Sequence, residues 1–274
     1  MNTENLLFAF LLTLFAGLST GIGSALAFFT KRTNTRFLTF SLGFSAGVMI
    51  YVSLVEIFQK SIQSFESLYT SKPANTFAVI SFFSGILIIA LIDKLIPSYE
   101  NPHEIRSIED LTEAENKVNK DKKLARMGAF SAIAIAIHNF PEGIATFAAG
   151  LADPSVALPI AFAIAIHNIP EGIAVSVPIY YATGNRRKAF LLSFLSGLAE
   201  PVGAIVGFFV IFYLFGGINP VISGVMFGAV SGIMVFISLD ELLPTSEEYG
   251  EHHISIYGLV AGMAIMALSL ILFM

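Results

Sequence analysis

Eight long apolar runs limit this chain to one class of fold. A helix rises about 1.5 Å per residue, so each run is long enough to cross the roughly 30 Å hydrocarbon core of a bilayer. The runs cover residues 6–29, 37–58, 76–96, 127–150, 157–181, 189–213, 221–243 and 256–274. We therefore predict an all-α polytopic membrane protein with eight transmembrane helices, forming a single transmembrane transporter domain over residues 1–274.

The amino-acid composition excludes a water-soluble domain. Of the 274 residues, 55% are hydrophobic and 13% are charged, and a soluble domain of this size could not bury so much apolar surface. The chain has no cysteine, which excludes disulfides and a thiolate zinc site. The first run is too long for the apolar region of a cleavable signal peptide, and its basic residues follow it. We expect a multi-pass protein of the cell (inner) membrane.

The positions of the basic residues predict the orientation of the chain. Of the 15 Lys and Arg residues, 13 lie in the connections after the first, third and fifth runs, and only Lys60 and Lys72 lie on the other side. The positive-inside rule makes the first side cytoplasmic, so both termini are predicted to be extracytoplasmic. The connection at 97–126 is long, polar and of mixed charge, and we expect a cytoplasmic loop that is partly disordered or forms a short amphipathic helix.

One polar motif occurs twice inside the apolar runs. Residues 133–145 read IAIAIHNFPEGIA, and residues 162–174 read FAIAIHNIPEGIA. Three polar side chains of each copy are three or four residues apart and so share one face of a helix. They are His138, Asn139 and Glu142 in the first copy, and His167, Asn168 and Glu171 in the second. Two such faces turned towards each other would suit Zn²⁺, iron or manganese.

The ionisable residues of three different runs lie at one depth. His138, His167 and Glu200 are each about 15–17 Å from the face where their run enters the membrane, near the centre of the bilayer. A carboxylate there is costly unless it is paired or bound to metal. Hydrogen bonds between helices are the alternative explanation for these residues, but two copies of the motif together with Glu200 favour a metal site.

Prolines accompany the polar residues in these three runs. Pro141, Pro170 and Pro201 each remove a helical hydrogen bond. They predict either an ordinary kink of a transmembrane helix or a local break that opens the ligand-bearing face.

A second internal repeat relates the two ends of the chain. Residues 16–29 resemble residues 196–209, and residues 45–58 resemble residues 230–243. The first run therefore pairs with the sixth, the second with the seventh, and the fourth with the fifth. By order the third pairs with the eighth, where Gly85 matches Gly262. An offset of five runs turns the copies upside down, which predicts an inverted repeat arranged three plus two plus three, an architecture typical of secondary transporters.

Three further carboxylates lie near the ends of the paired runs. Glu56 is near the outer end of the second run, and Asp240 and Glu241 are near the inner end of the seventh. They are either interfacial carboxylates wetted by water or residues that attract a cation at each mouth of a pathway. The repeat makes Glu56 and Glu241 counterparts.

These features together resemble a known family. HNFPEG, HNIPEG, AEP at 199–201 and SLDELLP at 238–244, on eight spans with a long cytoplasmic loop after the third, resemble the ZIP (Zrt/Irt-like) metal transporters. The resemblance implies uptake of divalent metals, chiefly Zn²⁺ and also Fe²⁺, Mn²⁺, Co²⁺ or Cd²⁺, into the cytoplasm. It also implies a homodimer and a binuclear site whose two metal positions share the glutamates of the motifs. Its ligands would be His138, Glu142, His167 and Glu171 at one position, and Asn139, Glu142, Asn168, Glu171 and Glu200 at the other.

Two classes of function are compatible with such a site. The first is a metal permease, in which the ion enters past Glu56, binds between the fourth, fifth and sixth spans, and leaves near Asp240 and Glu241. An exporter with the same site is not distinguished by the residues, and only the resemblance favours import. The second class is an intramembrane metal-dependent hydrolase, against which no separate nucleophile stands near the site. We expect the metal ion and the lipid bilayer as partners, no nucleic acid, and no cofactor besides the transported ion.

Overall fold

The structure is a computed structural model, and it describes most of the chain outside the long polar connection. The described residues are 3–26, 35–95, 132–133, 135–137, 139–144, 146–148, 150–151, 154–214, 216–249 and 251–273. The loop predicted at 97–126 lies outside them. Within the described residues the regular structure is entirely helical.

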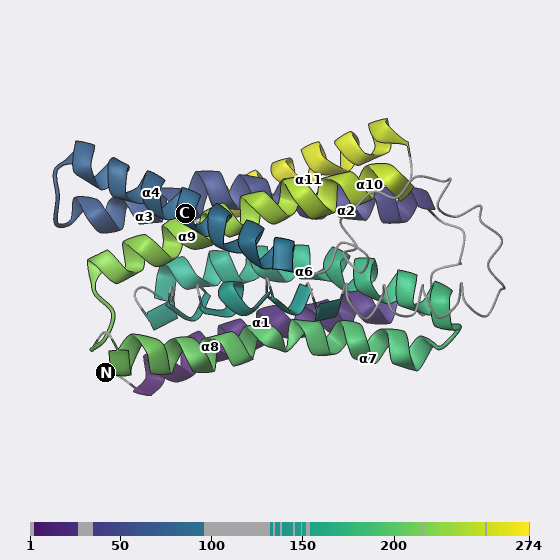
Figure 1. Ribbon diagram of the computed structural model, residues 1–274, viewed down its shortest axis with the longest axis horizontal. Helices are drawn as coiled ribbons and strands as arrows, with labels where there is room; N and C mark the ends of the chain where they lie inside the picture. The colour runs from purple at the N-terminus through teal and green to yellow at the C-terminus, as the bar shows by residue number, and fades with distance from the viewer. Residues whose placement is uncertain are drawn as a thin grey trace.

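The helices lie side by side along the longest axis of the molecule (Figure 1). The first half of the chain contains α1 (Thr3–Leu26), α2 (Thr35–Val52), the π-helix η1 (Ser53–Ile57), α3 (Phe58–Glu66) and α4 (Ser71–Leu95). The second half contains α6 (Pro154–Thr183), α7 (Arg186–Gly197), α8 (Ala199–Phe209), the π-helix η3 (Val210–Leu214), α9 (Pro220–Ile237), the π-helix η4 (Ser238–Leu242), α10 (Leu243–Tyr249) and α11 (His252–Phe273). Between the halves, the described residues from 132 to 151 are also helical.

Many of these helices are long enough and apolar enough to cross a membrane. Within the described residues there are six such segments, at Asn5–Ala25, Thr39–Glu66, Ser71–Ile92, Arg186–Leu214, Pro220–Asp240 and His252–Leu272. The predicted polytopic membrane protein is thereby confirmed. The two segments that carry the HN motifs, at 132–151 and in the 30-residue α6, are not among the six.

The second membrane helix is longer than its apolar run. The run ends at residue 58, but α2, η1 and α3 form a continuous series as far as Glu66. Polar residues end an apolar run without ending a helix, and α3 is held in place by packing. Phe65 packs against the alanines at the start of α4, and the hydroxyl of Ser61 donates a hydrogen bond of 2.6 Å to the carbonyl of Gly224 on α9.

The starts of α2 and α11 lie at the same end of the bundle. Arg36, at the start of α2, forms an ion pair of 2.7 Å with Glu251, which directly precedes α11. The α3–α4 turn lies at the opposite end, towards which the labels for both chain termini also lie (Figure 1). The predicted topology requires α2 and α11 to start on one side of the membrane, and this ion pair agrees with it.

Close approaches of backbone hold α2 against α11. A Cβ atom built on Gly47 would overlap the carbonyl oxygen of Leu259, and one built on Gly262 would overlap that of Phe44. In lipid, an apolar side chain gains little free energy by moving from acyl chains to a neighbouring helix. Membrane helices therefore associate largely through close packing at small residues. Gly47 and Gly262 therefore contribute to the association of α2 and α11 by letting their backbones come close together.

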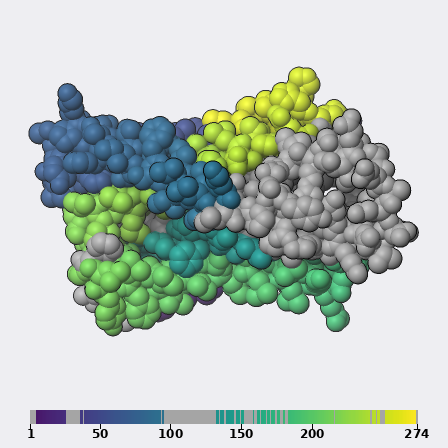
Figure 2. Space-filling view, viewed as in Figure 1, coloured from purple at the N-terminus to yellow at the C-terminus, as the bar shows by residue number. Residues whose placement is uncertain are grey.

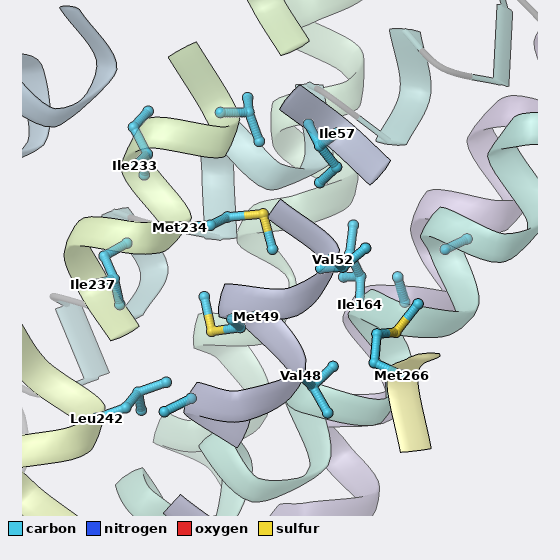
Figure 3. Packing of buried hydrophobic residues seen from close by; sticks show 14 of the residues in the cluster. Val48, Met49, Val52, Ile57, Ile164, Ile233, Met234, Ile237, Leu242 and Met266 are labelled. Carbon is cyan, nitrogen blue, oxygen red and sulfur yellow. The ribbon is translucent and has the colours of Figure 1, made fainter. Parts of the chain in front are cut away.

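The largest apolar cluster joins residues of α1, α2, α4, α6, α9 and α11. Met49 on α2 and Met234 on α9 are fully buried, and both point into the space between these two helices (Figure 3). Ile164 on α6 and Met266 on α11 complete the cluster on the other side of α2. The cluster keeps α6, and with it the second HN motif, against α2.

The outer surface of α4 is apolar. Phe83 is 61% exposed and Leu87 is 60% exposed, and the side chains of α3 and α4 form the blue outer face in Figure 2. Water would disfavour such a face, whereas lipid chains solvate it. We infer that α4 faces the bilayer.

Candidate metal site

The second HN motif lies in the middle of a continuous helix. HNIPEG occupies residues 167–172 of α6, which runs without interruption from Pro154 to Thr183. A local break at Pro170 is therefore not observed, and the helix accommodates the proline. In the first copy, the described residues 139–144 around Pro141 are helical as well.

The third proline sits at a helix start. The sixth span is interrupted at Leu198, which ends α7 and caps α8 (Ala199–Phe209). Pro201 lies in the first turn of α8, where a backbone N–H has no partner within the helix, so the proline removes little there. Glu200 lies in the same first turn of α8, and its side chain is fully buried.

Asn168 connects three helices through its amide nitrogen. Nδ2 donates a hydrogen bond of 2.9 Å to the backbone carbonyl of Ala16 on α1, and a second, short one to Oε1 of Glu200 on α8. Both partners accept hydrogen bonds, so the amide must turn its NH₂ group towards them. Its Oδ1 then points away, and it has no hydrogen-bond partner among the described residues. Asn168 thus presents a buried neutral oxygen, the kind of ligand that a divalent cation can take.

Three carboxylates are buried around this amide. Within the described part of the chain, the fully buried ionisable side chains are Glu142, Glu171 and Glu200. The carboxylate of Glu200 interacts electrostatically with that of Glu142 and with that of Glu171. Like charges held together in a low dielectric repel each other unless protons or cations neutralise them. A cation or a proton near Glu200 would therefore stabilise this part of the bundle.

The histidines of the motifs are not part of the described site. His138 lies outside the described residues, and His167 belongs to α6 but its side chain is not described. Asn139, beside His138, is fully buried, and neither atom of its amide has a hydrogen-bond partner among the described residues. Where the structure describes side chains, it contains no set of three His, Asp or Glu residues grouped closely enough to hold one ion. Coordination by the predicted ligands stays a prediction.

The predicted pathway residues lie in the π-helices. Glu56 is in η1 and forms an ion pair of 3.7 Å with Lys60, one turn further along the helix. Asp240 and Glu241 are in η4, where Asp240 is exposed and the side chain of Glu241 is not described. A single π-helical turn is wider than an α-helical turn and is frequent at functional sites, so their placement there is compatible with the predicted roles.

One buried polar residue next to the site was not expected from the sequence. Thr20 on α1 is fully buried, and its hydroxyl has no hydrogen-bond partner among the described residues. It lies one helical turn after Ala16, which accepts the amide of Asn168. The internal repeat contained the signal, because aligning residues 16–29 with 196–209 puts Thr20 opposite Glu200.

The chain is similar over nearly its whole length to one family of membrane proteins. The sequence matches the family described as "ZIP Zinc transporter" over residues 4–270. It is 59% identical over 282 residues to "Zinc transporter ZupT" of Clostridium perfringens, covering 99% of this chain and 98% of that protein. It is 60% identical over 271 residues to the ZupT proteins of Chlorobium chlorochromatii and of Streptococcus mutans, with 99% of each chain covered.

Proposed function

Because this chain belongs to the ZIP zinc transporter family, we propose that it carries divalent metal ions, chiefly Zn²⁺, across the cell membrane into the cytoplasm. The observation that carries the proposal is the burial of three carboxylates, of which Glu200 accepts a hydrogen bond from Asn168 and interacts electrostatically with Glu142 and Glu171. Such a group is costly in an apolar bundle unless a cation visits it. Relatives that share more than half of their residues with this chain are named zinc transporters, which selects the cation.

The proposed binding site is binuclear and uses both motifs. One ion would be held by the histidines and glutamates, and the second by the asparagines, the same two glutamates and Glu200. The ligands of the first position are His138, Glu142, His167 and Glu171, and those of the second are Asn139, Glu142, Asn168, Glu171 and Glu200. The orientation of the Asn168 amide supports its part in this set, because the oxygen is the atom left without a hydrogen bond. A mixture of neutral and anionic oxygen ligands with imidazole fits Zn²⁺ and also admits Fe²⁺, Mn²⁺, Co²⁺ and Cd²⁺.

The bundle is an inverted repeat of eight spans, arranged three plus two plus three, with both termini outside. Matching helix contacts in the two halves support this proposal. A Cβ atom on Gly47 would overlap the carbonyl oxygen of Leu259, and one on its counterpart Gly232 would overlap that of Phe82. Phe82 and Leu259 are themselves counterparts, each three residues before the matched glycine of the third or eighth span.

The two central spans contact the rest of the bundle in the same mirrored way. A Cβ atom on Gly23 would overlap the carbonyl oxygen of Ile169, and one on its counterpart Gly203 would overlap that of Phe140. Ile169 and Phe140 occupy the same place in the two HN motifs. If these helix contacts were unrelated, we would not expect them to recur at positions that the repeat makes counterparts.

The paired π-helices support the same symmetry and the proposed pathway. η1 begins at Ser53 and η4 at its counterpart Ser238, and each is five residues long. The carboxylates of Glu56 and Glu241 would then attract the ion at opposite mouths, with Asp240 beside the inner one. A wider helical turn changes the direction of its side chains at little cost in hydrogen bonds, which suits a mouth that opens and closes.

Family membership also decides between the two classes of function. The matched family is described as transporters, so the alternative function of an intramembrane hydrolase is not favoured. The homodimer that the resemblance implies, and the single domain over residues 1–274, remain predictions of the proposal.

Flux into liposomes tests the proposed function. We would reconstitute the full chain with a zinc-sensitive dye inside, add Zn²⁺ outside, and compare the wild type with Glu171→Ala and His138→Ala. We expect flux in the wild type and a loss of about tenfold or more in both variants, because each substitution removes a side chain that is proposed to bind the metal directly. Glu66→Ala, at the exposed end of α3, is the matched control and should transport normally. Absence of flux from folded, Zn²⁺-binding wild-type protein would refute the proposal.

A further inference from the structure

Thr20 lies one helical turn after Ala16, whose carbonyl accepts the amide of Asn168, and its backbone carbonyl lies against Gly172, directly after Glu171. We propose that Thr20 is a specificity-determining residue of the metal site, where its hydroxyl takes the place in one half of the bundle that the carboxylate of Glu200 takes in the other. The inference rests on the proposed function, and it adds one neutral oxygen to the ligand environment.

The backbone of Thr20 is placed as that of Glu200 is placed. Aligning the repeats pairs Thr20 with Glu200. A Cβ atom on Gly172, directly after the carboxylate residue of the second motif, would overlap the carbonyl oxygen of Thr20. A Cβ atom on Gly143, directly after Glu142, would overlap the carbonyl oxygen of Glu200 in the same way. Each residue therefore crosses one HN motif immediately next to its glutamate.

The hydroxyl of Thr20 is not used by its own helix. A threonine in a membrane helix normally donates to the carbonyl four residues earlier, as Thr13 does to Ala9 at 3.0 Å and Thr146 does to Glu142 at 2.9 Å. For Thr20 that carbonyl is Ala16, which is already occupied. It accepts the amide of Asn168 at 2.9 Å and the hydroxyl of Ser19 at 2.6 Å. Oγ1 of Thr20 has no partner among the described residues although it is fully buried.

The hydroxyl of Thr20 lies where α1 crosses the α7–α8 junction. A Cβ atom built on Gly197, three residues before Glu200, would lie 2.7 Å from Oγ1 of Thr20. On the opposite helix, a Cβ atom on Gly17 would lie 3.3 Å from Cβ of Glu200. At the crossing of α1 and the α7–α8 junction, Thr20 thus packs against Gly197, and Glu200 packs against Gly17. A buried oxygen without a hydrogen bond costs free energy unless an ion or a bound water uses it.

The chemical difference between the two counterparts sets the selectivity. A fourth carboxylate would bind divalent ions more tightly and release them more slowly, whereas a hydroxyl supplies an oxygen without a charge. Mn²⁺ prefers oxygen ligands, while imidazole already suits Zn²⁺. The Thr20 hydroxyl should therefore matter more for Mn²⁺ than for Zn²⁺, and it widens the range of ions that the site accepts.

The test compares the two ions in three variants of the full chain. Thr20→Val removes the hydroxyl and keeps the shape, Thr20→Ser keeps the hydroxyl, and Thr13→Val removes a buried hydroxyl of the same helix that is bonded to its own backbone. Initial rates of Zn²⁺ and Mn²⁺ entry are measured in liposomes, and binding of both ions is measured by calorimetry in detergent.

We expect Thr20→Val to lower Mn²⁺ entry about fivefold and Zn²⁺ entry about twofold or less, the size of one lost polar contact. Thr20→Ser should restore the wild-type ratio, and Thr13→Val should not change it. A purely structural role would change both ions equally and would overturn the proposal, as would an unchanged ratio in a folded variant. If Thr20→Val does not fold, Thr20→Ala against Thr20→Ser gives the same comparison.

The proposed transport and the proposed role of Thr20 can be refuted separately. A wild type that binds both ions but carries neither refutes the proposed transport, and the calorimetric Mn²⁺-to-Zn²⁺ ratio of Thr20→Val still decides the role of Thr20. A wild type that transports, with Thr20→Val indistinguishable from it, refutes the role of Thr20 alone.

Discussion

The contact between Asn168 and Glu200 should be measurable as a coupling energy. Both groups are fully buried, and the amide donates to the carboxylate across two helices. Hydrogen bonds with a charged partner contribute about 1.5–3 kcal/mol in soluble proteins, whereas hydrogen bonds between membrane helices average about 0.6 kcal/mol and reach about 1.7. For a buried hydrogen bond between membrane helices we therefore expect a coupling of about 0.6–1.7 kcal/mol.

The two single substitutions should differ in the size of their effect on the free energy of unfolding. Asn168→Ala removes the bonds to Glu200 and to the carbonyl of Ala16, so it should destabilise the folded state by about 1–3 kcal/mol. Glu200→Ala removes a carboxylate that is repelled by Glu142 and Glu171, so its cost should be smaller, and it can even stabilise the metal-free protein. A double-mutant cycle separates the pairwise energy from these other effects.

The measurement is reversible unfolding of the purified chain in mixed micelles with a metal chelator, followed by circular dichroism. Asn75→Ala is the matched control, because the amide of Asn75 is exposed on α4 and bonds within its own helix, to the carbonyl of Ser71 at 2.8 Å. That control should stay within about 0.5 kcal/mol of the wild type. A coupling below about 0.3 kcal/mol between Asn168→Ala and Glu200→Ala would refute the reasoning, because the two side chains would then be neighbours without a significant interaction.

Two further substitutions test the packing of the bundle. Gly47→Ala should destabilise the fold by more than Gly184→Ala. The new Cβ at position 47 would overlap the carbonyl of Leu259, whereas position 184 lies in open space and an alanine there costs only about 1 kcal/mol for its positive φ. Equal free energies of unfolding in micelles would contradict this prediction. Ser231→Ala should cost about 0.5–1.5 kcal/mol by removing the 2.8 Å hydrogen bond to the carbonyl of Ser53 at the start of η1, and an unchanged midpoint of thermal unfolding would count against that bond.

The extent of the second span shows where sequence reasoning about the fold ended. The apolar run predicted a helix ending at residue 58, and the helix series continues to Glu66. Hydropathy describes the solvent that a residue prefers, and it contains no information on a polar helical turn held by a neighbour. That turn is held by Phe65 and by the hydrogen bond from Ser61 to Gly224, and both depend on α4 and α9 being adjacent.

The site shows the same division among its residues. Spacing alone placed Asn168 and Glu171 on one helical face, and depth alone placed Glu200 near them. Neither indicated which atom of the Asn168 amide is left without a hydrogen bond, nor that the buried hydroxyl of Thr20 has no partner among the described residues. Both depend on Ala16, whose carbonyl takes the amide of Asn168 and so leaves the hydroxyl of Thr20 without its usual acceptor.

The sequence by itself determined that this protein is a helical membrane protein and which segments carry its polar residues. Those properties follow from short-range rules, since the length of an apolar run and the period of a helix involve only neighbouring residues. The tertiary structure decided which helices meet and which hydrogen bonds form where they cross. Those contacts join residues more than a hundred positions apart, as Asn168 and Ala16 are, and a close approach of two backbones depends on the geometry of both helices.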